Sequence, residues 1–233
     1  MGRLHSYGNK AKQILYLFMA EIFMSIRIKL TNPTQEIMTA GYSALSKEVN
    51  NRIVKNIPKI VVKIKEAIGN SISFHPTVMA LSDYAPGWLA SELGLYPGQG
   101  SLAASQIVDI VTEDVEFRFS KINTKLQGRI QFYIAHEAVS RLVALPIGHV
   151  IYGKGDLHWL KWLLERGDAI IIDSYEYNPQ SGFGRSGGGS MALGVSWRVP
   201  PEYAGTPDKN FISDALFSKP FQYTLQNIIE RYL

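Results

Sequence analysis

The sequence predicts an α+β fold in which N-terminal helices are followed by an antiparallel β-sheet with short helices packed on it. Apolar residues at helical spacing run through residues 34–69. Two segments in which apolar and polar residues alternate, 115–120 and 129–134, indicate a β-hairpin. A further pair of expected strands, 169–177 and 191–199, flanks a glycine-rich loop. Helices and antiparallel strands in separate parts of a chain are typical of the α+β class.

The predicted N-terminal helical part carries an apolar stripe that indicates one buried face. Pro58 lies inside this stripe and lacks a backbone donor, so we expect a kink or two abutting helices there. Gly69 and Asn70 provide a signal for the C-terminus of the helix. The stripe consists of Leu45, Val49, Ile53, Ile57, Ile60, Ile64 and Ile68, which step by three or four positions.

Shorter elements are expected around these strands. The segment 74–100 is rich in turn residues and excludes long regular elements. Ser101 precedes an apolar pattern and is a candidate helix cap. The expected short helices are 88–95, 101–111, 136–142, 157–164, 210–217 and 221–232, and 147–152 is an expected strand.

The domain organisation follows from length and composition. The chain has 233 residues, of which 46% are hydrophobic and 19% are charged, and this provides ample material for one core. We expect a helical N-terminal extension over residues 1–24 and a single α+β domain over 25–233. That domain includes the helical part at about 34–69 and C-terminal helices at about 210–232.

The N-terminal segment partly resembles a signal peptide, because basic residues precede the apolar run Ile14 to Phe23. Glu21 interrupts the run, and no small-residue cleavage site follows it. The run is also shorter than the roughly 20 residues that span a bilayer. We therefore expect an amphipathic or core-docking helix, with membrane association as an alternative.

Charge is distributed unevenly along the chain. Residues 1–70 contain 11 Lys and Arg against 4 Asp and Glu, whereas residues 71–233 contain 13 against 16. Such a chain can pair opposite faces of neighbouring copies, or present its basic end to nucleic acid or to a membrane. A simply solvated helix face is the alternative interpretation. The basic flank of the helical stripe consists of Arg52, Lys55, Lys59 and Lys63.

The sequence contains no complete catalytic or cofactor motif, so no catalytic, cofactor-binding or metal-binding residue is predicted. The chain has no cysteine, which excludes disulfides, thiolate metal sites and a Cys nucleophile. Gly182, Gly184 and Gly187 fit G-x-G-x-x-G, but a strand pattern follows them instead of a helix.

The histidines do not form a recognisable metal motif either. His136 and Glu137 begin an H-E-x-x-H pattern whose fifth position is Ser140. His149 and His158 have a local spacing that is unsuitable for joint ligation. An enzyme with an unfamiliar site around the loop 182–190 and Arg198 is a further hypothesis.

The C-terminal third contains the most distinctive sequence segments. It includes Leu157 to Leu164, the strand Ala169 to Asp173, Gly184 to Met191, and Trp197-Arg198-Val199-Pro200-Pro201-Glu202-Tyr203-Ala204-Gly205-Thr206 followed by Asn210 to Ile212. These segments resemble tailed-bacteriophage neck, head-to-tail joining or tail-completion proteins, broadly the minor tail protein Z-like group. The resemblance extends over residues 25 to 215, and an earlier segment, Trp88 to Leu95, belongs to it. Residues 1–23 depart from it as an extension.

The resemblance implies a structural virion protein without enzymatic activity. Such a subunit forms a hexamer or dodecamer ring, as a head-tail connector, tail terminator or other neck protein, and lets genomic DNA pass through its lumen. Its partners are copies of itself and other neck, portal or tail proteins, with no membrane and no cofactor. It is assembled in the host bacterial cytoplasm and located in the virion.

Six basic residues are candidates for contact with a neighbouring subunit or with DNA. The glycine-rich loop could reach a neighbour, and Pro200 and Pro201 fix an extended arm. The alternative function is a nucleic-acid-binding module that uses the basic helix face on phosphates. The six residues are Arg52, Lys55, Lys59, Lys63, Arg185 and Arg198.

Overall fold

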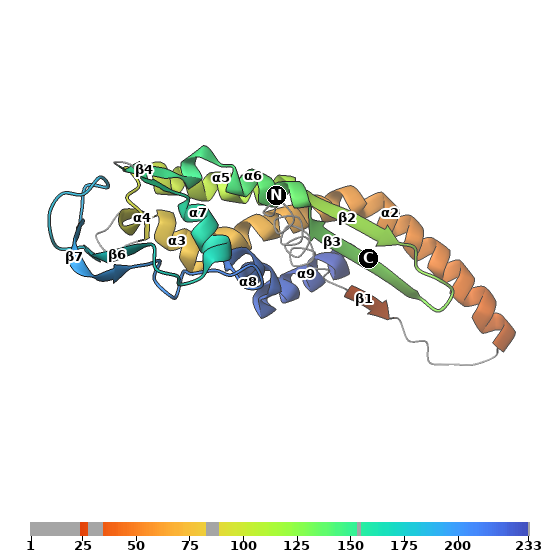
Figure 1. The fold of residues 1–233 in the computed structure, drawn as a ribbon. Helices are drawn as coiled ribbons and strands as arrows, with labels where there is room; N and C mark the ends of the chain where they lie inside the picture. The colour runs from red at the N-terminus through yellow and green to blue at the C-terminus, as the bar shows by residue number, and fades with distance from the viewer. Residues whose placement is uncertain (1–23, 28–34, 83–88, 153–154, 233) are drawn as a thin grey trace, which may run out of the picture.

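The computed structural model describes residues 24–27, 35–82, 89–152 and 155–232. Helix α2 (Gln35–Ser73) is 39 residues long and runs from one end of the elongated molecule into its middle (Figure 1). The expected N-terminal extension lies outside the described residues, except for Met24. Strand β1 (Met24–Arg27) begins at that residue and was not predicted. The α+β class is confirmed.

The apolar stripe forms the buried face of α2, as predicted. The helix nevertheless continues through Pro58, so the expectation of two abutting helices is wrong. Pro58 and Val54, whose carbonyl loses its helical partner, both lie on the exposed side of the helix, where water can satisfy that carbonyl. Helix α2 also continues past Gly69 and Asn70, since Ile72 is fully buried and extends the stripe.

Gly69 lies inside α2 and faces helix α5 (Gln99–Glu113) instead of capping α2. A Cβ at this position would lie 3.4 Å from the side chains of Val108 and Thr112, which is ordinary van der Waals contact.

The first sheet contains the predicted hairpin. Strands β2 (Val115–Ser120) and β3 (Gln127–Ile134) pair antiparallel, with Phe117 opposite Phe132, and β1 pairs with the other edge of β3. Within the described segments the remaining strands form two separate antiparallel pairs, β4 (Val150–Tyr152) with β5 (Gly155–Leu157) and β6 (Ile172–Asn178) with β7 (Ser190–Trp197). The sheet is thus divided into three small sheets.

One main core joins most of the elements. The C-terminal half of α2 packs against α5, and helices α8 (Phe211–Phe217) and α9 (Lys219–Tyr232) cover another side of it. Helix α3 (Pro76–Ser82) packs on α5, and the short helices α4 (Leu89–Glu92) and α6 (His136–Val143) complete this layer. No helix in the described segments is long and apolar enough to cross a membrane.

The segment 157–164, an expected short helix, contributes to the main core. Trp159 is fully buried in α7 (Trp159–Lys161), and its indole N–H donates to the carbonyl of Ile147 at 2.8 Å. The next turn, η2 (Trp162–Arg166), is a π-helix, and it ends at Gly167, which has a φ of 62°.

Several element boundaries differ from the prediction. Helix α5 begins at Gln99, and the hydroxyl of Ser101 donates to the carbonyl of Ser82 instead of capping the helix. Strand β4 starts late because Pro146–Gly148 forms a 3-10 turn, η1. In contrast, Asn210 caps α8 with a capping box in which its side chain accepts from Ser213 N–H.

A second, smaller core holds the N-terminal half of α2 against the β2–β3 hairpin. Ile53, Ile122 and Leu126 are buried there, and Phe119 packs against them. Asn50 on α2 links the two elements, because its side chain donates to the carbonyl of Ile122 at 2.9 Å and accepts from the N–H of the same residue at 2.8 Å.

Substitution Asn50→Ala is expected to lower the free energy of unfolding by about 2–3 kcal/mol, since two hydrogen bonds to the backbone of Ile122 are lost. Urea denaturation measures the change. Asn51→Ala, on the neighbouring exposed position, is the matched control and should change stability by less than about 0.5 kcal/mol. Equal effects of the two substitutions would contradict this role of Asn50.

Candidate functional site

The β6–β7 hairpin and its glycine-rich loop form one end of the molecule (Figure 1). The loop folds back on itself, because Gly184 N–H donates to the carbonyl of Gly189 at 2.6 Å and the hydroxyl of Ser186 donates to the carbonyl of Gly188 at 3.0 Å. Ser186 is buried under this loop. The loop is therefore a closed structural unit that covers what lies beneath it.

Gly189 is the position where this loop most requires glycine. Its φ of 66° lies in the left-handed region, and a Cβ there would overlap the ring of Tyr177. Gly187 has a φ of 88° but open space around it. The loop therefore depends on Gly189 for close approach to β6 as well as for backbone conformation.

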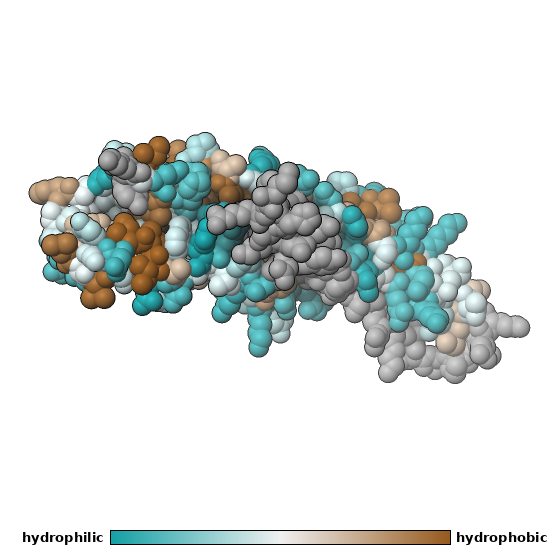
Figure 2. All heavy atoms as spheres, viewed as in Figure 1, coloured by the Kyte–Doolittle hydropathy of each residue, from teal (hydrophilic) through white to brown (hydrophobic). Residues whose placement is uncertain are grey.

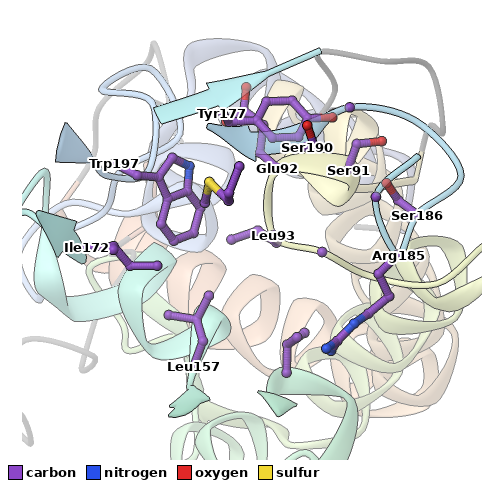
Figure 3. Close-up of a pocket in the computed structure, with 15 residues that line it drawn as sticks. Ser91, Glu92, Leu93, Leu157, Ile172, Tyr177, Arg185, Ser186, Ser190 and Trp197 are labelled. Atoms are coloured by element: carbon purple, nitrogen blue, oxygen red, sulfur yellow. The ribbon is translucent and has the colours of Figure 1, made fainter. Parts of the chain in front are cut away.

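A cavity of about 210 Å³ lies beneath the loop (Figure 3). Four parts of the chain form it: the glycine-rich loop, the β6–β7 hairpin, the β4–β5 hairpin and the segment around α4. Most of its lining is apolar. Its larger lining side chains are Leu93, Val150, Leu157, Ile172, Tyr177, Met191 and Trp197.

Two residues that line this cavity carry polar groups in unusual environments, the indole of Trp197 and the carboxyl group of Glu92. The indole nitrogen of Trp197 is buried and has no hydrogen-bond partner within the described part of the chain. Burial, together with the negative charge of Glu202, raises the pKa of Glu92 to about 7. The cavity thus combines an apolar wall with a carboxyl group whose pKa lies near neutral. It suits an inserted apolar group.

The two arginines predicted as contact residues lie near this end. The guanidinium of Arg185 donates to the carbonyl of Ile151 at 2.7 Å and lies 5.5 Å from the ring centroid of Tyr96. It therefore fastens the loop to β4. Arg198 lies 3.5 Å from the carboxylate of Asp168, and because both side chains are exposed this pair contributes little to stability.

The four basic residues predicted on the helix lie elsewhere, on the exposed side of α2. Two of them are neutralised locally, since Arg52 pairs with Glu48 at 2.9 Å and Lys63 pairs with Glu66 at 2.6 Å. The helix itself thus offsets part of the repulsion along this flank. Figure 1 places this part of α2 away from the β6–β7 end, so the structure does not bring the six predicted residues together.

An exposed apolar surface on the hairpin was missed by the sequence analysis. The side chains of Phe183, Leu193 and Val195 are 96%, 81% and 82% exposed, and Tyr175 pairs with Leu193 across the hairpin. We call these four residues the apolar hairpin surface. Figure 2 shows hydrophobic residues gathered at this end of the molecule.

The signal for this surface is present in the alternation of β7. Small residues occupy every second position, Ser190, Ala192, Gly194 and Ser196, and across the hairpin this face carries exposed polar residues of β6 such as Glu176. The larger apolar residues of β7 lie on the other face, where Met191 and Trp197 line the cavity and Leu193 and Val195 are exposed. An alternating strand is normally interpreted with its apolar face inward. Here the body covers the apolar face only at the two ends of β7, so that Leu193 and Val195 between them stay exposed.

The expectation about the histidines is wrong for one pair. His149 and His158 lie next to each other across the β4–β5 hairpin, with ring centroids 3.6 Å apart, because antiparallel pairing brings distant positions together. Their separation along the chain is therefore suitable for a shared site. The side chain of His136 lies outside the described residues.

Comparison of the chain with protein-family models, curated protein sequences and solved structures gave no match.

Substitution Gly189→Ala is expected to open the glycine-rich loop, because the added methyl group overlaps Tyr177 and the backbone is left-handed. Gly187→Ala is the matched control, with the backbone penalty of about 1 kcal/mol but no overlap. Limited trypsin digestion measures the rate of cleavage after Arg185. Faster cleavage is expected in Gly189→Ala than in Gly187→Ala, and equal rates would contradict the packing role of Gly189.

Proposed function

We propose that this chain is a structural subunit of the neck or tail-completion region of tailed bacteriophages, which assembles with copies of itself into a ring that connects the head to the tail. The observation that carries the proposal is the apolar hairpin surface. Phe183, Leu193 and Val195 are almost fully exposed in the single chain. A cluster of exposed large apolar side chains marks an interaction site, because its burial is favourable.

The position of this surface suits a ring. A ring that closes by rotation requires two different complementary patches on each subunit. The apolar hairpin surface lies at one end of an elongated molecule, and the exposed basic residues of α2 lie away from it (Figures 1 and 2). The apolar hairpin surface can supply one patch of such a contact, and the basic residues of α2 stay available for a different partner.

The segment 197–206 resembles tailed-phage neck proteins. This resemblance supports a ring of the phage neck or tail-completion region as the assembly. These residues attach the hairpin to the body, because Val199 is fully buried and a Cβ at Gly205 would overlap the carbonyl of Leu163. The segment with the resemblance is therefore also the segment that sets the position of the hairpin. The proposed location is the virion, with portal and tail proteins as neighbours and DNA in the lumen.

The double substitution Leu193→Asp and Val195→Asp tests the proposal, since it places two charges on the apolar hairpin surface. Both side chains are solvated in the single chain, so the subunit should remain folded, as circular dichroism can verify. Mass photometry and negative-stain microscopy should show a ring for the natural sequence and single subunits for the double variant.

The matched control is Tyr223→Asp, which places a charge at an exposed residue of α9 and should leave the ring intact. A double variant that still forms rings would contradict the role of the hairpin. Absence of the chain from purified virions would contradict the phage assignment.

A second candidate function, nucleic-acid binding, is favoured by a groove beside the basic face of α2. The groove has a volume of about 530 Å³ and lies between α2 and the segment that follows β2. It contains Lys47, Lys55 and Lys121, together with asparagine and serine side chains, and no carboxylate among its described lining residues. Such a lining suits a phosphate backbone.

This candidate predicts that the affinity for duplex DNA falls steeply with salt, because lysine contacts release counterions from phosphates. Replacing Lys47, Lys55 and Lys121 by Ala should reduce the slope of log K against log salt by up to about three. Fluorescence anisotropy over a salt series measures it. Replacing Lys161, Lys209 and Lys219 is the control with equal change of charge. Identical slopes in the two variants would exclude this groove.

A further inference from the structure

The β4–β5 hairpin brings three potential metal ligands to one face. Val150 pairs with Leu157, so the next residues outward, His149 and His158, lie directly opposite each other. Side chains alternate between the two faces of a strand, which places Asp156 on the same face as His158. Val150 and Leu157 point to the opposite, buried face and line the cavity.

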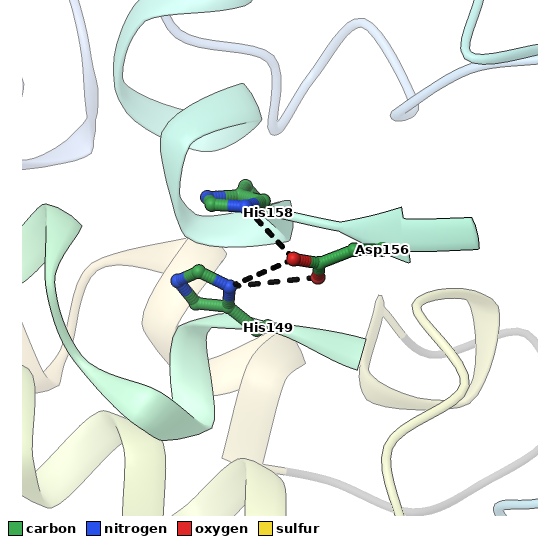
Figure 4. Close-up of side chains that lie close together, drawn as sticks. All are labelled: His149, Asp156 and His158. Atoms are coloured by element: carbon green, nitrogen blue, oxygen red, sulfur yellow. Dashed lines mark hydrogen bonds and ion pairs between the residues drawn. The ribbon is translucent and has the colours of Figure 1, made fainter. Parts of the chain in front are cut away.

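The ligand atoms of these three residues converge (Figure 4). Nδ1 of His149 lies 3.5 Å from the carboxylate of Asp156, and Nε2 of His158 lies 3.0 Å from the same group. All three ligand atoms lie within 4.8 Å of one another. A tetrahedron with metal–ligand bonds of about 2.0–2.1 Å has edges of about 3.3 Å. Small side-chain rotations therefore suffice to form one face of such a site.

Both imidazoles use this carboxylate as their hydrogen-bond partner, and the described residues provide no other partner for either ring. The ring centroids are 3.6 Å apart, closer than the 4.5–7 Å that is usual for aromatic pairs. In this arrangement both nitrogens donate to the carboxylate; in the other tautomer of each ring, the same two nitrogens direct lone pairs at the point that Asp156 faces. A divalent cation satisfies such a set.

We propose that His149, Asp156 and His158 form a binding site for a divalent transition-metal ion, with Zn²⁺ as the best match. Two imidazole nitrogens and one carboxylate oxygen suit zinc, whereas Mg²⁺ and Ca²⁺ prefer oxygen ligands alone. The side chains of His149, Asp156 and His158 are 26%, 49% and 44% exposed, so water can reach the open fourth position. This proposal does not depend on the proposed function.

The bound ion would stabilise one wall of the candidate functional site. It would clamp β4 to β5, and these strands contribute Val150 and Leu157 to the cavity. The carbonyl of Ile151, on the same hairpin, accepts the hydrogen bond from Arg185 of the glycine-rich loop. Metal occupancy would therefore hold both the cavity wall and the attachment of the loop.

The test is a titration of Zn²⁺ into the untagged, chelator-treated full chain by isothermal calorimetry, with Co²⁺ absorption spectra as a second measurement of ligand number. One ion per chain is expected, together with a rise in the thermal unfolding temperature. His149→Ala, Asp156→Asn and His158→Gln should each weaken Zn²⁺ binding by at least about tenfold. Circular dichroism verifies that each variant is folded.

The matched controls are His75→Asn, which keeps an acceptor for the N–H of Thr77, and Asp168→Asn, an exposed carboxylate elsewhere. Both should bind Zn²⁺ as the natural sequence does. Absence of binding by the natural sequence, or unchanged binding by all three site variants, would overturn the site. Equal affinity for Mg²⁺ or Ca²⁺ would overturn its assignment to a transition metal.

Discussion

Burial of one face along the 39 residues of α2 is the constraint on which the rest of the structure depends. Ile60, Ile64 and Ile68 on this face belong to the main core, and Ile53 belongs to the smaller core against the β2–β3 hairpin. Each fully buried isoleucine contributes about 1.5–3 kcal/mol. The helix thus joins two cores that would otherwise be separate, and its continuity through Pro58 keeps them in fixed register.

Helix α2 and the two cores that it joins support the β6–β7 end of the molecule without covering it. The hairpin attaches through Trp197, which is buried and pairs with Ile172, and through the glycine-rich loop, which Arg185 fastens to β4. Leu193 and Val195 of the hairpin remain exposed in the single chain. The cavity beside them is lined mostly by apolar side chains. These features together favour a surface that is completed by another molecule, and a second copy of the chain is the occupant that we propose.

The sequence predicted those elements whose own pattern determines them. Alternation gave the β2–β3 hairpin, and helical spacing gave the buried face of α2. Predictions failed where a distant segment decides the outcome. Gly69 and Asn70 signal a helix end, but α2 continues past them because Ile72 is buried in the core. The exposure of Leu193 and Val195 depends on how far the body extends beneath β7, and the proximity of His149 to His158 depends on strand register.

The most direct test of the apolar hairpin surface as the contact between subunits is a cryo-electron microscopy map of the assembled ring. In that map, Leu193 and Val195 of each subunit should be buried against the neighbouring subunit around the whole ring. A map in which both side chains face solvent in every subunit would contradict it.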